Sequence, residues 1–174
     1  LNGNSREIEA ALQEHRIDLG LVEGISRLPN LKYTTFLQDE LVAVVHIGNK
    51  LSLPDEITPE DLSRIPLVLR ERGSGTLDVF ERALSGHNIK LSSLNVLLYL
   101  GSTESIKLFL EHTDCMGIVS IRSISRELLS GTFRVIEIKG MPMLREFCFA
   151  QPQGQESGLS QVLMQFAMHH NKKL

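Results

Sequence analysis

The chain has 174 residues, a formal net charge of −3, and 42% hydrophobic against 22% charged residues. This balance is that of an ordinary globular protein and excludes a disordered chain. No apolar run approaches the ~18 residues of a membrane-spanning helix, and the small negative charge gives no electrostatic reason to hold nucleic acid. Asn2, Asn4 and Arg6 interrupt the opening residues, so we expect no signal peptide there.

Two cysteines, Cys115 and Cys148, are too few for a disulfide framework or a zinc site. Each stands beside an apolar run, which favours a small core residue over a reactive thiol. A redox pair would require the fold to bring the two together. The sequence therefore predicts a reduced, cytoplasmic protein that needs neither a metal nor a cofactor.

The first third of the chain predicts one helix and three strands. Asn4 and Glu7 have the spacing of a capping box, which places a helix start near residue 5 with its apolar stripe inward. Residues 17–22, IDLGLV, follow as a strand. Residues 31–38 alternate like a half-buried strand, whereas the next strand, residues 39–47, contains the almost continuously apolar run LVAVVHI, as in a strand covered on both faces.

Two strand–loop–helix units occupy the middle of the chain. Residues 66–69 lead through a glycine-containing turn, GSGT, into a helix over 77–84, and residues 95–100 lead through GST into a helix from 103. Hydroxyls and free N–H groups at such a helix start suit a small anion, although a routine connection has the same pattern. GSGT lacks the lysine and the length of a nucleotide-binding P-loop.

The last third predicts strands at 117–121, 134–138 and 144–150, and a final helix over 160–170. In that helix the side chains that share an apolar face are Val162, Leu163, Phe166 and Ala167. The alternation of strands and helices indicates an α/β fold with mixed, mostly parallel sheets.

The two long apolar strands flank a self-contained block, which indicates two lobes joined by two crossover strands. We predict that lobe I comprises residues 1–46 and 143–174, and that lobe II comprises residues 47–142. A ligand would then lie between the lobes.

Four motifs, in this order and spacing, resemble the effector-binding domain of LysR-type transcriptional regulators: GNSREIEAALQEHRIDLGLVEG, LRERGSGTLDVFERAL, GSTESIKLFLEHTDCMGIVSI and LLSGTFRVIEIKG. The resemblance covers nearly the whole chain. It implies two α/β lobes of the type 2 periplasmic-binding-protein kind, a small-molecule effector between them, and a homodimer or homotetramer formed through this domain. DNA binding would belong to an N-terminal winged helix-turn-helix that this sequence does not contain.

The sequence departs from the family pattern in two further ways. The first strand and helix of lobe I are absent, which would expose an apolar face and predicts poor solubility or compensating association. Ser120 stands where many members have proline, a variant similar to members that sense small sulfur-containing or other inorganic anions.

Matching the motifs position by position assigns eight residues to the effector site: Asn4, Glu23, Ser74, Gly75, Thr76, Ser102, Thr103 and Ser120. Hydroxyl and amide donors of this kind would bind a carboxylate or an inorganic anion, with Arg70 and Arg72 adding positive charge. Other roles fit as well. Asn4, Thr76 and Ser102 also suit helix caps, the two arginines suit solvated surface, and the Glu23 carboxylate would repel an anion.

These observations predict a ligand-sensing regulatory domain without catalytic residues. The sequence has no HExxH, CxxC or GxSxG motif. A solute-binding protein of a transport system shares the architecture and is the alternative. A third class, an enzyme on the same two-lobed fold, would need a reactive residue in the cleft, and none stands out.

Overall fold

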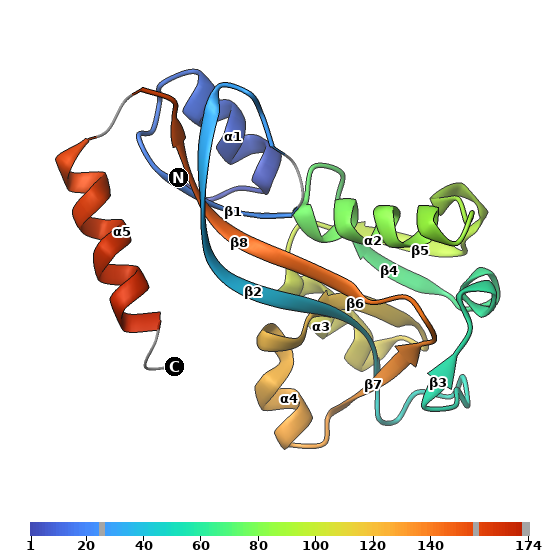
Figure 1. Cartoon of the computed structure of the whole chain (residues 1–174). Coiled ribbons are helices and arrows are strands. Elements are labelled where there is room, and N and C mark those ends of the chain that lie inside the picture. The colour runs from blue at the N-terminus through green and yellow to red at the C-terminus, as the bar shows by residue number, and fades with distance from the viewer. Residues whose placement is uncertain (25–26, 155–156, 172–174) are drawn as a thin grey trace. The chain divides into compact units, whose positions relative to one another are not determined.

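The computed structural model describes residues 1–24, 27–154 and 157–171. Its helices are α1 (Ser5–Gln13), α2 (Gly75–Gly86), α3 (Thr103–His112), α4 (Ser125–Leu129) and α5 (Gly158–Asn171), with short 3₁₀-helices η1 (Pro59–Arg64), η2 (Leu91–Ser93) and η3 (Ile121–Ile124) (Figure 1). Its strands are β1 (Gly20–Gly24), β2 (Leu31–His46), β3 (Glu56–Ile57), β4 (Leu67–Arg70), β5 (Val96–Leu100), β6 (Met116–Ser120), β7 (Phe133–Ile138) and β8 (Met143–Pro152).

The chain divides into two compact units. Unit 1 comprises Leu1–Gln38, Gly73–Gly75 and Arg145–Leu174, and unit 2 comprises Asp39–Arg72 and Thr76–Leu144. The functional lobes with boundaries at 46/47 and 142/143 stay a prediction, and residues 25–26, 155–156 and 172–174 of the predicted lobe I lie outside the described residues. In the part of the chain that is described, no helix is both long enough and apolar enough to cross a bilayer.

Unit 1 is built on strands β1, β8 and the first half of β2, in that order. β8 is antiparallel to β1, with Gly20 opposite Ala150 and Gly24 opposite Glu146. Helix α1 covers one face, and the buried cluster there is Ile8, Leu12, Val22, Leu31, Cys148 and Ala150. The predicted capping box of α1 is confirmed, because Asn4 accepts from the Glu7 amide and the Glu7 side chain accepts from the Asn4 amide.

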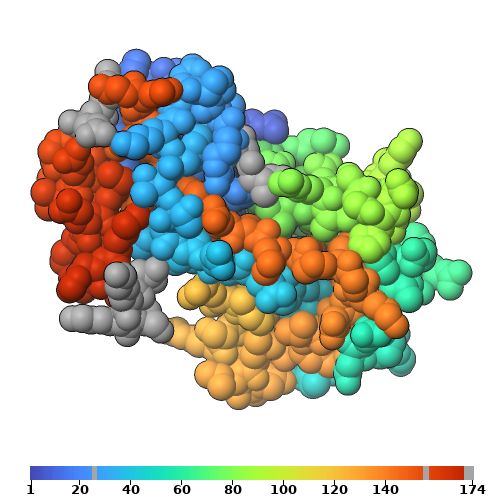
Figure 2. Space-filling model, viewed as in Figure 1, coloured from blue at the N-terminus to red at the C-terminus, as the bar shows by residue number. Residues whose placement is uncertain are grey.

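Helix α5 of unit 1 leaves most of its predicted apolar face exposed. Of the four residues of that face, three are exposed, with Val162 at 64%, Leu163 at 54% and Phe166 at 60%, and Leu159 extends the same stripe at 82%. Figure 2 shows this helix, in red, at the surface. The buried side is instead Ser160 with the half-buried Met164, Ala167 and Met168. Both sides of α5 carry apolar residues at helical spacing, so periodicity alone does not identify the packed one.

Unit 2 has the strand order β2-β6-β4-β5, with α2 on one face of the sheet and α3 and α4 on the other (Figure 1). β4 is parallel to both β5 and β6, whereas β6 and β7 are antiparallel to β2. The predicted α/β fold with a mixed sheet is therefore confirmed. Its parallel part is centred on β4, and the ladders of the long strands β2 and β8 with β1, β6 and β7 are antiparallel.

Strand β2 differs from its prediction as two strands. It runs without a break over 16 residues, because neither Gly nor Pro interrupts residues 31–46. The change from an alternating to a continuous apolar pattern marks a change in what covers the strand. From Leu41 onward both faces are buried, with Val44 in the core cluster that also contains Val68, Ile106 and Phe133.

Both cysteines are buried core residues, as predicted, and neither forms a disulfide within the described residues. Cys115 belongs to the core of unit 2 and Cys148 to that of unit 1. Burial raises the pKa of Cys115 to about 11 and also raises the pKa of Cys148, so both thiols stay protonated at neutral pH.

Candidate functional site

Four of the predicted site residues, Asn4, Glu23, Ser74 and Gly75, meet in unit 1. The Arg6 amide donates to the Gly73 carbonyl at 3.2 Å, and a Cβ at Gly73 would lie 3.1 Å from Asn4 Oδ1. Gly75 is packed so closely on the end of β1 that a Cβ there would collide with the Glu23 carbonyl oxygen. These residues therefore contact one another directly, and Ser74, which lies between the two glycines, is fully buried.

The charge of Glu23 has a partner that sequence reasoning missed. Arg145, whose side chain is 2% exposed, donates from Nη1 to Glu23 Oε2 at 2.7 Å, and its guanidinium stacks 4.9 Å from the centre of the Phe147 ring. The Ser5 hydroxyl also holds the Glu23 backbone, donating to its carbonyl at 2.7 Å. A neutralised Glu23 removes the repulsion that an anion would otherwise meet.

In unit 2 three of the other predicted site residues, Ser102, Thr103 and Ser120, lie at one edge of the sheet. Because β4, β5 and β6 are parallel, their carboxyl ends share that edge. Arg70 ends β4, the turn at Gly101 and Ser102 follows β5, and Ser120 ends β6. The carboxyl edge of parallel strands is where open α/β sheets bind ligands.

The start of α3 offers hydrogen-bond donors at this edge. Ser102 is the N-cap and its hydroxyl accepts from the Ser105 amide at 3.1 Å, which confirms the helix-cap interpretation. Thr103, the first residue of the helix, is half-buried, and its hydroxyl has no hydrogen-bond partner among the described residues. The free amides of a first helical turn and an available hydroxyl together suit an acceptor group.

Ser120 is held by a second residue that sequence reasoning missed. Its hydroxyl donates to Asp39 Oδ1 at 2.8 Å and accepts from the Arg122 amide at 3.2 Å. The Asp39 side chain is fully buried, and Arg122 Nε lies 3.9 Å from the same oxygen. The Ser120 hydroxyl therefore already donates its proton to Asp39, and it can only accept a hydrogen bond from a ligand.

The remaining predicted residues have less direct roles. Thr76 is 4% exposed in the first turn of α2. Arg70 is bound on both sides, to Glu71 at 2.9 Å and to the Gly101 carbonyl at 3.3 Å, so it braces the edge. Arg72 is exposed and has no ion pair within the described residues, which agrees with solvated surface.

Neither Asp39 nor Arg145 was predicted to be a site residue, although the sequence around each indicates a buried, paired charge. Each is one of two adjacent charged residues at the start of an otherwise mostly apolar strand, in DELVAVVHI and LREFCFA, and it is the one of the two that is buried. A charge in such a position is buried only when it is paired, which marks it as a structural or functional partner.

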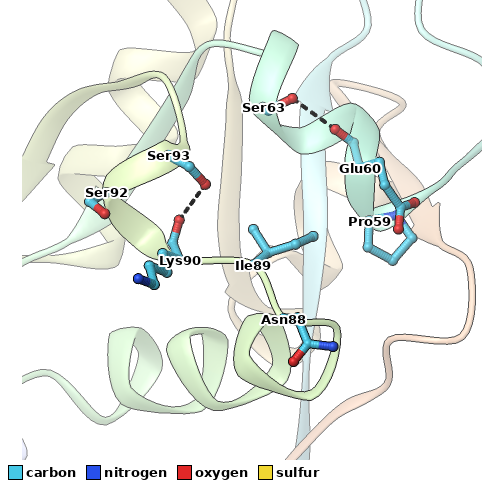
Figure 3. Close-up of a pocket in the computed structure, with 8 residues that line it drawn as sticks. All are labelled: Pro59, Glu60, Ser63, Asn88, Ile89, Lys90, Ser92 and Ser93. Atoms are coloured by element: carbon cyan, nitrogen blue, oxygen red, sulfur yellow. Dashed lines mark hydrogen bonds between the residues drawn. The ribbon is translucent and has the colours of Figure 1, made fainter.

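Unit 2 also has a surface groove of about 460 Å³ between η1 and the segment after α2. Figure 3 shows that the hydroxyls of Ser63 and Ser93 point at the carbonyls of Glu60 and Lys90, to which they donate. The groove contains none of the predicted effector residues. Its polar side chains are exposed or already bonded, so it has no convergent set of donors.

Comparison with known proteins places this geometry in a family. The family model of the LysR substrate binding domain matches residues 1–172. The uncharacterized HTH-type transcriptional regulator YeiE of Escherichia coli K12 is 31% identical over 136 residues, which are 78% of this chain and 45% of that protein. The chain thus spans about half the length of the curated relatives it matches.

Two solved structures share the fold. The Synechocystis PCC6803 CcmR regulatory domain in complex with 2-PG has a TM-score of 0.81 at 24% identity and covers 98% of this chain and 81% of that one. The effector binding domain of QuiR in complex with shikimate also has a TM-score of 0.81, at 19% identity, over 98% of this chain and 79% of that one. These matches identify the type 2 periplasmic-binding-like fold of LysR regulatory domains and do not favour the transport alternative.

Proposed function

Because the chain belongs to the LysR substrate-binding-domain family, we propose that it senses a small, anionic effector on behalf of a transcriptional regulator. DNA binding would be performed by a separate winged helix-turn-helix, in the cytoplasm. The chain itself would carry out no catalysis, in keeping with relatives that are named as transcriptional regulators.

The observation that carries the proposal is the set of donors at the carboxyl edge of unit 2. The hydroxyl of Thr103 and the first two amides of α3, those of Thr103 and Glu104, have no protein acceptor in the described residues, whereas the Ser105 amide is capped by Ser102. Such donors stabilise a carboxylate or an inorganic anion without a lysine. The two solved neighbours are complexes with the small molecules 2-PG and shikimate, which supports an effector of similar size.

We propose that the effector acts by differential affinity. A ligand shifts a conformational equilibrium only as far as it binds one state more tightly than the other. The segment Gly73–Gly75, which belongs to unit 1 while Arg72 and Thr76 belong to unit 2, is the part of the chain whose packing such a shift would change. Effector binding would then regulate transcription by changing how the subunits of the oligomer pack against one another.

The proposed assembly is a homodimer or homotetramer in which unit 2 supplies a sheet edge. β5 pairs with β4 on one side and ends the strand order. Its sequence VLLYL has no charged residue, and Leu97, Leu98 and Tyr99 are 47%, 42% and 42% exposed. An open apolar edge of this kind is normally covered in a native protein. A second copy of the same neutral edge is the partner that such a strand fits.

The test is a calorimetric and thermal-shift screen of small carboxylates, sulfate, sulfite and phosphate. A ligand at ~100 times its dissociation constant adds ~2.7 kcal/mol to the free energy of unfolding, which visibly raises the melting temperature. Thr103→Val should weaken binding of the hit about tenfold by removing one donor. Thr132→Val, at a half-buried threonine before β7, is the matched control and should leave binding unchanged. Equal loss in both variants, or no anion that binds, would contradict the proposal.

A further inference from the structure

The hydroxyl of Ser120 has a fixed hydrogen-bonding polarity. A serine hydroxyl has one proton and two lone pairs. The proton goes to Asp39 Oδ1 at 2.8 Å, and one lone pair receives the Arg122 amide at 3.2 Å. One lone pair remains, so Ser120 can accept one further hydrogen bond but has none to donate.

Burial makes this polarity persistent. Ser120 is 8% exposed and the Asp39 side chain is fully buried, so water does not compete for their bond. The exposed side chain of Arg122 lies on the solvent side of this bond, with Nε 3.9 Å from Asp39 Oδ1. A ligand that offered an acceptor to Ser120 would leave two acceptors facing each other, one of them beside a buried carboxylate.

From this geometry we infer that the effector carries a hydrogen-bond donor, a hydroxyl or an ammonium group, in addition to its acidic group, and that Asp39 sets this requirement through Ser120. The inference rests on the proposed function, because it takes Ser120 to line the effector site. The acidic group meets the donors at the start of α3 and the donor group meets Ser120. Both places belong to the carboxyl edge of unit 2. The effector class is therefore a small hydroxy acid or amino acid, and a simple anion such as sulfate falls outside it.

Matched pairs of acids test the requirement. Shikimate is compared with cyclohex-1-ene-1-carboxylate, which is the same ring without hydroxyls. Glycerate and β-alanine are each compared with propionate, which separates a hydroxyl from an ammonium donor. Dissociation constants come from isothermal titration calorimetry. At least one donor-bearing acid should bind the wild-type chain about tenfold or more tightly than its partner, because a site built around a donor rejects the analogue that lacks it.

Three variants locate the cause of the preference. Ser120→Ala removes the acceptor and should reduce the preference to less than about threefold. Asp39→Asn lets a carboxamide N–H point at Ser120, which frees the serine proton, so the donorless acids should gain affinity. Glu40→Gln removes a charge from the next, exposed position of β2 and should leave the preference intact, which separates hydrogen bonding from general electrostatics.

The outcomes separate the two proposals. Matched partners that bind equally well, or a preference that survives Ser120→Ala, would overturn this inference and leave the sensing of anions standing. If none of the acids, with or without a donor, binds at millimolar concentration, this inference fails, and if sulfate, sulfite and phosphate do not bind either, the proposed function fails with it. Each variant is first checked for cooperative unfolding, and if Asp39→Asn does not fold, Ser120→Ala decides the question.

Discussion

Lys107 shows how much of unit 2 depends on one side chain. Its side chain is 14% exposed, and its ammonium group is paired with Glu127 of α4 and with Glu104 one turn before it in α3 and donates to the Ser123 carbonyl at 3.3 Å. Glu127 is 19% exposed, and its Oε2 is buried with no hydrogen-bond partner in the described residues. The Lys107–Glu127 ion pair joins α3 to α4, and α4 directly follows η3, whose N-cap is Ser120.

We predict that Lys107→Met destabilises the chain by about 2–4 kcal/mol, because it leaves the Glu127 carboxylate buried without its cation. Urea unfolding measures the difference. Lys139→Met is the control, since the Lys139–Glu56 pair is 70% and 51% exposed and a surface pair contributes less than about 1 kcal/mol. Similar losses in the two variants would show that burial of the pair is irrelevant.

The same pair predicts a pH dependence. The hydrogen bond from Lys107 holds the pKa of Glu127 below its ordinary value of 4.5, so the folded state binds its proton less readily than the unfolded state. The stabilisation is therefore complete above about pH 5 and is lost as the pH falls through the lowered pKa. The stability difference between wild type and Lys107→Met should shrink between about pH 5 and pH 3 in urea titrations. A constant difference over that range would refute the assignment.

Residue-level prediction from the sequence succeeded where the partner is close along the chain. The capping box of Asn4 and Glu7 and the N-cap Ser102 depend on residues three positions apart, and both were predicted. The bond between Ser120 and Asp39 joins residues 81 positions apart, and no local pattern contains it. The helix cap of Ser102 was therefore predictable from the sequence, but the direction in which the Ser120 hydroxyl donates was not.

Among the elements, α2 contains an internal comparison of two glycines. A Cβ at Gly75 would collide with the Glu23 carbonyl oxygen, whereas a Cβ at Gly86 would meet nothing within 4 Å. We predict that Gly75→Ala destabilises the chain by about 1–3 kcal/mol through overpacking. Gly86→Ala in the same helix should stabilise it by up to about 1 kcal/mol through helix propensity. If the two substitutions shift the urea midpoint in the same direction, the close packing of Gly75 is contradicted.

The elements were predictable in kind and order, and less so in their packing. Helices α1 and α3 each have one apolar stripe, whose residues Ile8, Leu12, Ile106 and Leu110 are buried. Helix α5 has two such stripes, so the sequence leaves the choice to tertiary contacts. Strand β2 was divided in the prediction because its pattern changes at Asp39, although the backbone continues.

At the scale of the whole molecule, the open edge of β5 predicts association. The wild-type chain should form a dimer or a larger species whose share rises with concentration in sedimentation velocity. Leu98→Lys places a charge on the edge and should shift the chain towards monomer. Leu129→Lys is the control, because Leu129 lies on α4, away from the β5 edge, and is 90% exposed. If the wild-type chain is a monomer at all concentrations, β5 does not form the interface of the proposed assembly.

The division of unit 1 into three segments has a consequence for synthesis on the ribosome. Unit 2 is complete once Leu144 has been made, whereas unit 1 still lacks Arg145–Leu174, the segment that supplies β8 between β1 and β2. Domains generally fold as their residues emerge, so unit 2 should acquire structure first while the amino-terminal strands wait. Ribosome-bound chains in which residues 1–144 have emerged but residues 145–174 have not should therefore resist proteases over unit 2 and be cleaved within residues 1–38.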